Sequence, residues 1–267
     1  MIPKFSPAPL IYVVLLMVPV YWLIIMSVKT IGEITGEITF YPHAPTAENY
    51  QFILNDASLH YGYVNATIYV LMNVVISVVV AVPAAYGFSR YRFFGDRVLF
   101  FGFLAFRMMA PAVLLLPFVE IFSELNLIDT HIAVAIAHCF FNVPLAIWIL
   151  EGFISSIPRE MDDIAKVDDY GFTRFFLRIL LPQIAPGITV AAFFCFMFSW
   201  TETLLSNALT VVHAKPIGGL MSRFATVLAA DVPLLAATGV LGLVPGIHLI
   251  IFMKKHLARG FSMGRVV

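Results

Sequence analysis

Charged residues are scarce in this chain of 267 residues. Asp, Glu, Lys and Arg together make up 12% of the sequence, whereas ordinary soluble domains carry about 25%. Hydrophobic residues make up 61%, more than a soluble fold of this length can cover with so few charges. The formal net charge is zero, so the basic surface that nucleic-acid binding requires is missing. These shortages exclude a soluble enzyme, a disordered chain and a nucleic-acid binder, and they indicate a protein embedded in a lipid bilayer.

Cysteines and the common enzyme motifs are also few or missing. Cys139 and Cys195 are the 2 cysteines, and each lies in an apolar run, which predicts small packing residues rather than a disulfide framework or a zinc site. The sequence contains neither a His-Glu-x-x-His motif nor a Walker A pattern, so it predicts neither a zinc protease nor an ATP site of that type. We therefore expect no cofactor in this chain and a partner that supplies the energy.

Six apolar stretches are long enough to cross a membrane. A helix needs about 20 residues, at 1.5 Å each, to span a hydrocarbon core of about 30 Å. The sequence thus predicts an all-α, polytopic membrane protein that forms a single transmembrane domain over residues 1–267. The predicted spans are 10–28, 64–86, 98–119, 132–151, 185–206 and 233–253.

The basic residues predict the orientation of these spans. Twelve of the 16 Lys and Arg residues lie at the two termini and in the connections after the second and fourth spans. Cytoplasmic connections carry such an excess. We therefore expect both termini on the cytoplasmic side.

The connection over residues 152–184 is long and has two distinct halves. Its first half holds a dense acidic group, formed by Glu160, Asp162, Asp163, Asp168 and Asp169. Its second half has phenylalanines and an isoleucine at the i, i+3, i+4, i+7 spacing of an amphipathic helix, namely Phe172, Phe175, Phe176 and Ile179. The pattern predicts a short helix, a turn at Gly171, and a second helix that lies against the bundle and ends at Leu181-Pro182.

The sequence from Ile157 to Gly171, followed by Ile179-Leu-Leu-Pro182, resembles the EAA loop of ABC-importer permeases. The residues at the family's acidic pair, its two alanines and its aspartate are Asp162, Asp163, Ile164, Ala165 and Asp168. The family's glycine falls on Asp169, and the nearest glycine, Gly171, comes two residues later.

Four more segments resemble the carbohydrate-uptake (maltose-type, type I importer) permeases: residues 27–65, 84–93, 198–202 and 259–264. The resemblance implies half of a translocation path for a sugar or polyol, glycerol or glycerol phosphate included, in a bacterial inner membrane. It also implies four kinds of partner: a second, related permease subunit, two ATPase subunits that hold ATP and Mg, a periplasmic or surface solute-binding protein, and the lipid bilayer.

In this family the EAA loop couples the permease to its ATPase. The resemblance implies that Glu160, Asp162, Asp163 and Asp168 meet basic residues of an ATPase groove, while Met161, Ile164 and Ala165 supply apolar contact. Asp169 and Gly171 complete the expected set. From the residues alone, a solvated acidic helix explains the loop equally well.

Several polar residues lie inside the predicted spans. A charge at the bilayer centre costs about 2.5–3.5 kcal/mol, so Arg107 and Glu202 demand an explanation. We expect Arg107 to line the translocation path or to pair with an acid such as Glu202; a fixed pair that locks two helices together is the alternative. Asn73, Asn142 and Trp200 could face a sugar, although interhelical hydrogen bonds and packing explain them as well. His138 and His248 are expected to bond to their neighbours.

Two other functions fit the residues less well. A secondary transporter is compatible with the composition, but the usual doubled repeat is missing. The pairs Asp162-Asp163 and Asp168-Asp169 could hold Mg²⁺ in a prenyltransferase-like enzyme, but the second facing acidic cluster that such a site needs does not occur.

Overall fold

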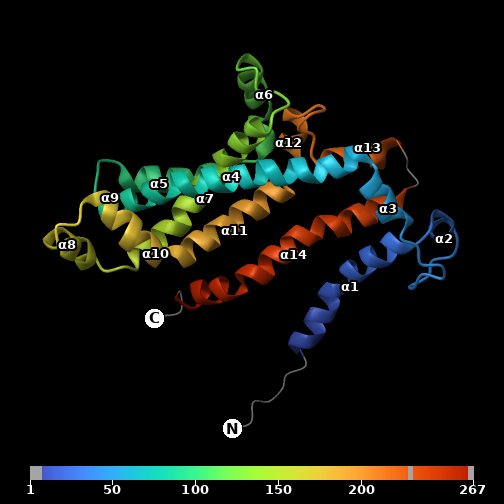
Figure 1. Ribbon diagram of the computed structural model, residues 1–267, viewed down its shortest axis with the longest axis horizontal. Coiled ribbons are helices and arrows are strands. Elements are labelled where there is room, and N and C mark those ends of the chain that lie inside the picture. The colour runs from blue at the N-terminus through green and yellow to red at the C-terminus, as the bar shows by residue number, and fades with distance from the viewer. Residues whose placement is uncertain (1–7, 228–230, 264–267) are drawn as a thin grey trace, which may run out of the picture. The chain divides into compact units, whose positions relative to one another are not determined.

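The computed structural model describes residues 8–227 and 231–263, with side chains for residues 9–222 and 231–254. Within these residues the chain forms helices and turns and no strand (Figure 1), so the predicted all-α class is confirmed. Lys4, the side chain of Arg223 and the segment 259–264 that resembles a family tail lie outside the described side chains. The cytoplasmic location of the termini stays a prediction.

Among the described residues, four helices are long and apolar enough to cross a membrane, and two bent pairs of helices bring the possible number of spans to six. This agrees with the six predicted spans. The four continuous helices are α1 (Ala8–Val28), α4 (Ala57–Arg90), α7 (His131–Ser155) and α14 (Val232–Met263).

The third predicted span, 98–119, is wrong as one continuous helix. It consists of α5 (Asp96–Arg107), the short 3-10 helix η1 (Pro111–Leu114) and α6 (Leu115–Glu124), with a bend of 97° between the two parts. Pro111 explains the break, because the residue before a proline avoids the helical conformation. Ala110 is accordingly extended, with φ −68° and ψ 133°.

The fifth predicted span, 185–206, is also interrupted. Helix α11 (Ala185–Thr201) ends at Glu202, which is extended with ψ 119°, and α12 (Leu204–Leu209) follows. The segment before α11 is bent by 74° from it. The predicted helix end at Leu181-Pro182 is wrong, because Pro182 lies in the first turn of α10 (Leu181–Gln183), where a missing N–H costs nothing.

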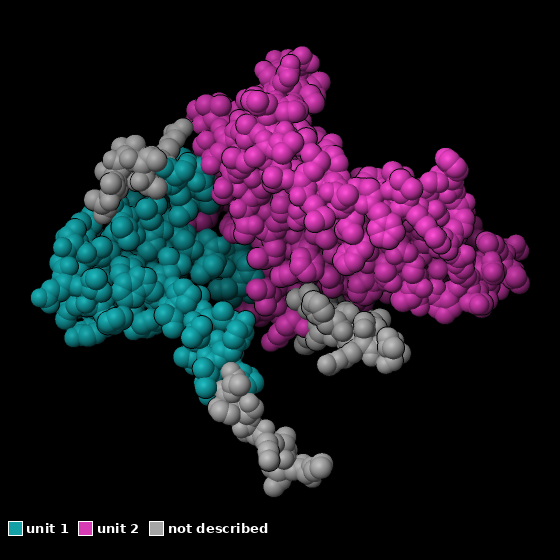
Figure 2. All heavy atoms as spheres, turned by 180° about the vertical axis from the view of Figure 1, so that it is seen from behind, with its two compact units in different colours: residues 1–62, 217–248 teal, residues 63–216, 249–267 magenta. Residues whose placement is uncertain are grey.

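The chain packs as two compact units, which Figure 2 shows in different colours. Unit 1 comprises residues 1–62 and 217–248. It includes α1, most of α14, α2 (Ile31–Thr35), α3 (Glu48–Asn55) and α13 (Ile217–Val227). Lys29 is buried here, and its Nζ donates to the carbonyl and the hydroxyl of Thr39 at 2.6 and 2.8 Å. The prediction of one domain over the whole chain stays a prediction.

Unit 2 comprises residues 63–216 and 249–267 and contains the core that holds the sites described below. Its core lies where α4, α7 and α11 pack together, and small side chains from each helix fill it (Figure 1). These include Ala81, Ala85, Ala146, Ala191 and Cys195. Cys139 and Cys195 are both buried with free thiols, as predicted for packing residues.

Helices α7 and α11 approach each other very closely at one point. A Cβ atom added at Gly187 of α11 would lie 2.5 Å from the Phe153 ring of α7. Gly187 itself is buried. A residue without a side chain is therefore required where these two helices cross.

Candidate functional site

The acidic half of the loop forms a short helix, α8 (Glu160–Val167). Three carboxylates lie in its first turn, Glu160, Asp162 and Asp163, and Lys166 lies in its last. This charge order complements the helix dipole, which favours acids at the N-terminus and bases at the C-terminus. The predicted short helix is confirmed.

The end of α8 is fixed by a left-handed residue. Asp169 has φ 56°, the N–H of Tyr170 donates to Ala165 O at 2.8 Å, and the N–H of Asp169 donates to Lys166 O at 3.2 Å. These two bonds with a left-handed residue form a Schellman motif, for which glycine is the usual choice. The predicted turn at Gly171 was therefore misplaced by two residues, because Gly171 has φ −60° and is the N-cap residue that precedes α9 (Phe172–Phe175).

The carboxylate of Asp162 is held inside the chain. Arg90 Nε lies 3.0 Å from Asp162 Oδ2, and the hydroxyl of Tyr86 donates to Asp162 Oδ1 at 2.8 Å. Only 7% of the Arg90 side chain and 11% of the Asp162 side chain are exposed. Asp162 thus anchors α8 to the end of α4, and its expected contact with a partner's groove stays a prediction.

Three more bonds hold the end of α4 to the segment that precedes α8. A guanidinium nitrogen of Arg90 donates to Ile157 O at 3.1 Å, and one of Arg159 donates to Ser89 O at 2.9 Å. The hydroxyls of Ser89 and Ser155 are 2.8 Å apart. Because arginine donates in a rigid planar fork, these contacts fix the direction in which α8 leaves α7.

The outer face of α8 carries both apolar and acidic groups. Ile164 is 60% exposed and Val167 is 84% exposed, and they are flanked by the exposed residues Glu160, Asp163 and Asp168. Ala165 is buried, and Met161 is half-buried. Of the expected apolar contacts, only Ile164 is thus fully presented outward, together with Val167, which we did not predict.

The phenylalanine stripe packs against α4. The rings of Phe172, Phe175 and Phe176 surround Tyr86, with centroid distances of 5.7, 6.5 and 5.8 Å. The helix continues through a π-helical turn, η2 (Phe176–Leu180), into α10. The prediction that this segment lies against the bundle is confirmed.

Arg107 is the last residue of α5, at the 97° bend. Its guanidinium lies 4.4 Å from the centre of the Phe198 ring, which is a cation–π arrangement. Within the described residues it forms no ion pair, and its Nε atom is buried without a hydrogen-bond partner. The expected pairing with Glu202 is wrong.

Glu202 bonds instead to His138 and to the start of α12. Its Oε2 lies 3.0 Å from His138 Nε2, while the backbone N–H groups of Leu204 and Leu205 donate to Oε1 at 2.8 and 3.0 Å. The carboxylate thus caps a helix N-terminus, a favourable place for a negative charge. His138 also bonds to Ser199 at 2.6 Å, so its expected bonding to neighbours is confirmed.

The remaining predicted path residues are held within the bundle. The amide nitrogen of Asn142 donates to Asn73 Oδ1 at 2.6 Å and to Cys195 O at 3.1 Å, and that of Asn73 donates to Ala135 O at 3.0 Å. Both asparagines are fully buried. Trp200 is half-buried and stacks on Phe196 with a centroid distance of 5.7 Å. In this structure the asparagines connect α4, α7 and α11.

The chain matches one family model over residues 73–263, described as the inner membrane component of binding-protein-dependent transport systems. The chain belongs to this family. It is therefore a permease, a non-catalytic subunit of an importer that lies in the inner membrane, and the enzyme and secondary-transporter alternatives are set aside.

Curated relatives match nearly the whole permease. The sulfoquinovosyl glycerol transport permease of Agrobacterium fabrum is 29% identical, covering 92% of this chain and 87% of the relative. The trehalose transport permease of Mycobacterium tuberculosis is 27% identical (94% and 92%), and a diacetylchitobiose uptake permease of Streptomyces coelicolor is 26% identical (94% and 92%).

Solved structures share the permease's fold. A bacterial ABC transporter that imports the acidic polysaccharide alginate matches with a TM-score of 0.76 and 20% identity, covering 95% of this chain and 99% of that one. An alginate transporter in complex with an alginate-bound periplasmic protein matches with a TM-score of 0.65 and 13% identity, with 94% of each chain covered.

Sequence reasoning missed the structural role of one residue of the permease, Asp129. Burial alone would raise the pKa of Asp129, but the N–H groups of four consecutive residues, 211–214, donate to its carboxylate at 2.9–3.1 Å and lower the pKa to about 2. Asn65 holds the same loop by donating to the carbonyls of His213 and Lys215. Asp129 is left-handed, with φ 63°, and an aspartate just before a helix N-terminus was the available signal.

Proposed function

We propose that this permease forms half of the translocation path of an ABC importer for a sugar or polyol, and that α8 docks on an ATPase subunit. The other half of the path would come from a second, related permease, and a solute-binding protein would deliver the substrate. Family membership carries this proposal. The position of α8, which is bound to α4 on one side and exposed on the other, supports the docking part of the proposal.

The substrate class follows from the relatives. The relatives named above carry sulfoquinovosyl glycerol, trehalose and diacetylchitobiose in their names, and all three are compounds rich in hydroxyl groups. A sugar or polyol, with glycerol and glycerol phosphate among the candidates, is the class that these names support. Uptake of a panel of these compounds by the reconstituted importer would test the class, and uptake confined to compounds without several hydroxyl groups would contradict it.

Coupling through α8 requires a surface that binds the ATPase and a connection that transmits movement of α8 to the membrane spans. Ile164 and Val167 form an apolar centre ringed by carboxylates, the arrangement of a polar-rimmed interface. Asp162 binds Arg90 of α4 at the other side of the same helix. A displacement of α8 would therefore move the end of a membrane span.

Arg107 is the residue that we place in the translocation path. It lies at a break between helices, its guanidinium lies over an aromatic ring, and its Nε atom has no hydrogen-bond partner among the described residues. Guanidinium N–H groups can donate to sugar hydroxyls. An Arg107→Ala importer that assembles but transports poorly would support this role, and failure to assemble even with Arg107→Lys would contradict it.

The docking of α8 can be tested by co-purification. Ile164→Asp places a charge in the exposed apolar centre without disturbing a buried residue, and we expect it to reduce recovery of the ATPase. Thr173→Asp is a matched control, because it introduces the same charge at an exposed position outside α8. Equal recovery of the ATPase with both variants would contradict docking through α8.

A further inference from the structure

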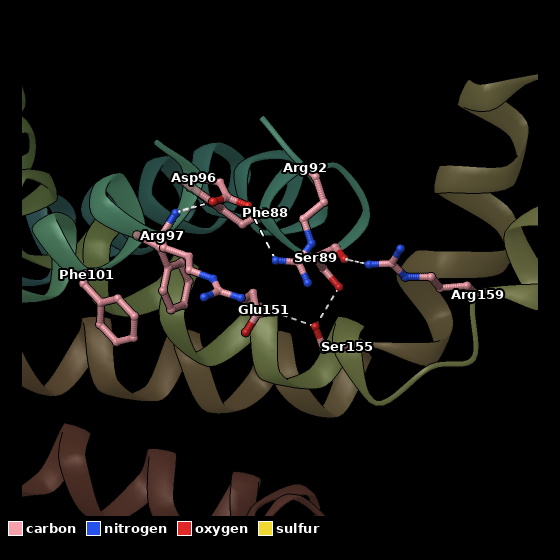
Figure 3. Close-up of a pocket in the computed structure, with 10 residues that line it drawn as sticks. Phe88, Ser89, Arg92, Asp96, Arg97, Phe101, Glu151, Ser155 and Arg159 are labelled. Carbon is pink, nitrogen blue, oxygen red and sulfur yellow. Dashed lines mark hydrogen bonds and ion pairs between the residues drawn. The ribbon is translucent and has the colours of Figure 1, made fainter. Parts of the chain in front are cut away.

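A cavity of about 210 Å³ lies in unit 2 between the ends of three membrane helices. It is formed where α4 ends, where α5 begins, and near the last turn of α7, and the segment before α8 closes one side (Figure 3). We propose that this cavity binds the headgroup phosphate of an anionic phospholipid.

The charges of the cavity favour an anion. Three guanidinium groups line it, those of Arg92, Arg97 and Arg159, against two carboxylates, those of Asp96 and Glu151. Figure 3 shows these five side chains around the same hollow. With all five groups ionised, the cavity carries one net positive charge.

The carboxylates do not neutralise all three arginines. Asp96 pairs with Arg92 at 3.7 Å and accepts from the backbone N–H of Arg97 at 2.6 Å. Glu151 accepts from Ser155 at 2.6 Å. Within the described part of the chain, the Arg97 guanidinium has neither an ion pair nor a hydrogen bond. Arg97 thus offers a planar donor that matches a phosphate.

The remaining wall of the cavity is aromatic and continues onto an apolar surface. Phe88, Phe100 and Phe101 line it, and Phe101 is 62% exposed one helical turn after Arg97. Val98 beside it on α5 is 79% exposed. A ligand here would have an anionic group among the arginines and a hydrocarbon part over Phe101.

The location selects a lipid from among anionic ligands. Helices α4 and α7 end at Arg90 and Ser155, and α5 begins at Asp96; the ends of helices that cross a bilayer are where we expect headgroup phosphates. Basic pockets between membrane helices bind anionic headgroups, and each Lys or Arg near the surface contributes about 1 kcal/mol. The cavity is also smaller than the ~300–1,000 Å³ of sites for drug-sized ligands, so it suits a headgroup better than a whole soluble metabolite. The inference depends on the membrane location of the permease and not on its substrate.

The test compares lipid retention by the purified importer complex. The complex is reconstituted in phosphatidylglycerol–phosphatidylcholine vesicles, re-extracted, and examined by native mass spectrometry for bound phosphatidylglycerol. We expect the wild-type complex to retain phosphatidylglycerol in preference to phosphatidylcholine. Arg97→Gln should lower the ratio of retained phosphatidylglycerol to phosphatidylcholine about fivefold, which corresponds to the contribution of one arginine at the membrane surface. Arg178→Gln removes an exposed arginine outside the cavity and should retain the lipid as wild type does.

Other outcomes would overturn the proposal. Equal retention of both lipids by wild type, or equal loss with Arg97→Gln and Arg178→Gln, would show that the cavity is not the site. Competition by millimolar inorganic phosphate that removes the difference between the lipids would assign the cavity to a free phosphate. If Arg97→Gln does not assemble, Arg92→Gln takes its place, and Arg97→Lys should keep most of the retention because it keeps the charge.

Discussion

Asp169 shows how a single residue can meet a backbone requirement normally met by glycine. It stands where the family resemblance places a glycine, and its φ of 56° ends α8 in the left-handed conformation. Aspartate tolerates this conformation better than most residues, because its short side chain can hydrogen-bond locally. The sequence alone predicted a turn in this segment but assigned it to Gly171, since residue type and not backbone angle is visible there.

Substitutions at Asp169 should separate the effect of its left-handed backbone conformation from the effect of its negative charge. We expect Asp169→Gly to be as stable as wild type or slightly more stable, and Asp169→Val to be less stable by about 1–2 kcal/mol, the cost of the left-handed region for a residue with a branched side chain. Thermal unfolding of the purified complex would measure the difference. Gly171→Ala should be neutral, because φ there is −60° and nothing lies within 4 Å of an added Cβ.

The carboxylate of Asp129 predicts a dependence of stability on acid. Its pKa is lowered from 3.8 to about 2 in the folded chain, so the unfolded chain binds the proton more readily. The stabilisation is therefore complete above about pH 4 and is lost as the pH falls toward 2. We expect Asp129→Asn to lower the unfolding temperature at pH 7, and the difference from wild type to shrink as the pH drops below 4.

A carboxylate without such partners provides the control for this pH series. Asp163 is exposed and pairs with Lys166 at the surface, and because such pairs contribute about 0–1 kcal/mol, Asp163→Asn should unfold close to wild type at pH 7. A gap between wild type and Asp129→Asn that stayed constant down to pH 2 would mean that the ionised carboxylate is not what holds residues 211–214.

At the scale of elements, the sequence predicted where the helices lie better than it predicted the breaks within them. Hydropathy locates an apolar stretch but not its continuity, because a bend leaves composition unchanged. Pro111 was a usable signal for the break after α5, since it constrains Ala110. The break at Glu202 had no comparable signal, because it depends on His138 and on the α12 backbone, which only folding brings to that carboxylate.

The crossing of α7 and α11 should be sensitive to one added methyl group. Gly187→Ala would place a Cβ 2.5–2.9 Å from atoms of Phe153, and overpacking of this kind typically costs 1–3 kcal/mol. We expect a lower unfolding temperature for Gly187→Ala. Adding Phe153→Leu should recover part of the loss, whereas the same Phe153→Leu change in wild type should destabilise. Additive losses in the double variant would argue against contact at this crossing.

At the scale of the whole molecule, the pair of Arg90 and Asp162 connects the proposed docking helix to a span. Removing one partner of a buried pair leaves an uncompensated charge, at a cost of up to about 3–5 kcal/mol. We expect Arg90→Ala to reduce transport more than it reduces ATP hydrolysis by the importer, and the exchanged pair Arg90→Asp with Asp162→Arg to restore part of the transport. The ratio of transport to hydrolysis is the measurement.

A second ion pair on α8 serves as the matched control. Lys166 and Asp163 are 74% and 72% exposed, and such surface pairs contribute about 0–1 kcal/mol. Lys166→Ala should leave the ratio of transport to hydrolysis unchanged. Parallel losses of transport and hydrolysis in Arg90→Ala would show that the pair maintains folding and not coupling.

Composition and hydropathy were sufficient to predict an all-α, polytopic membrane protein, and the loop motif together with the four other matching segments was sufficient to predict its family. Composition and motifs could not predict which partners the polar side chains contact. For Arg107 the sequence suggested a place in the translocation path or an acidic partner, whereas in the structure its guanidinium lies over the Phe198 ring. Asp162 was predicted to dock because it stands in the acidic group that resembles the EAA loop, whereas its partners Tyr86 and Arg90 lie more than seventy positions away in the sequence.

The anchoring of α8 also bears on how an importer would assemble. The contacts that end α8 at Asp169 and hold it to Arg90 all lie within the permease itself. A partner that binds it would not have to order it, so the conformational entropy usually lost when a flexible segment binds has been lost beforehand, during folding of the permease. Complex formation should then resemble the meeting of two rigid surfaces, with a rate set by diffusion and orientation and not by a folding step.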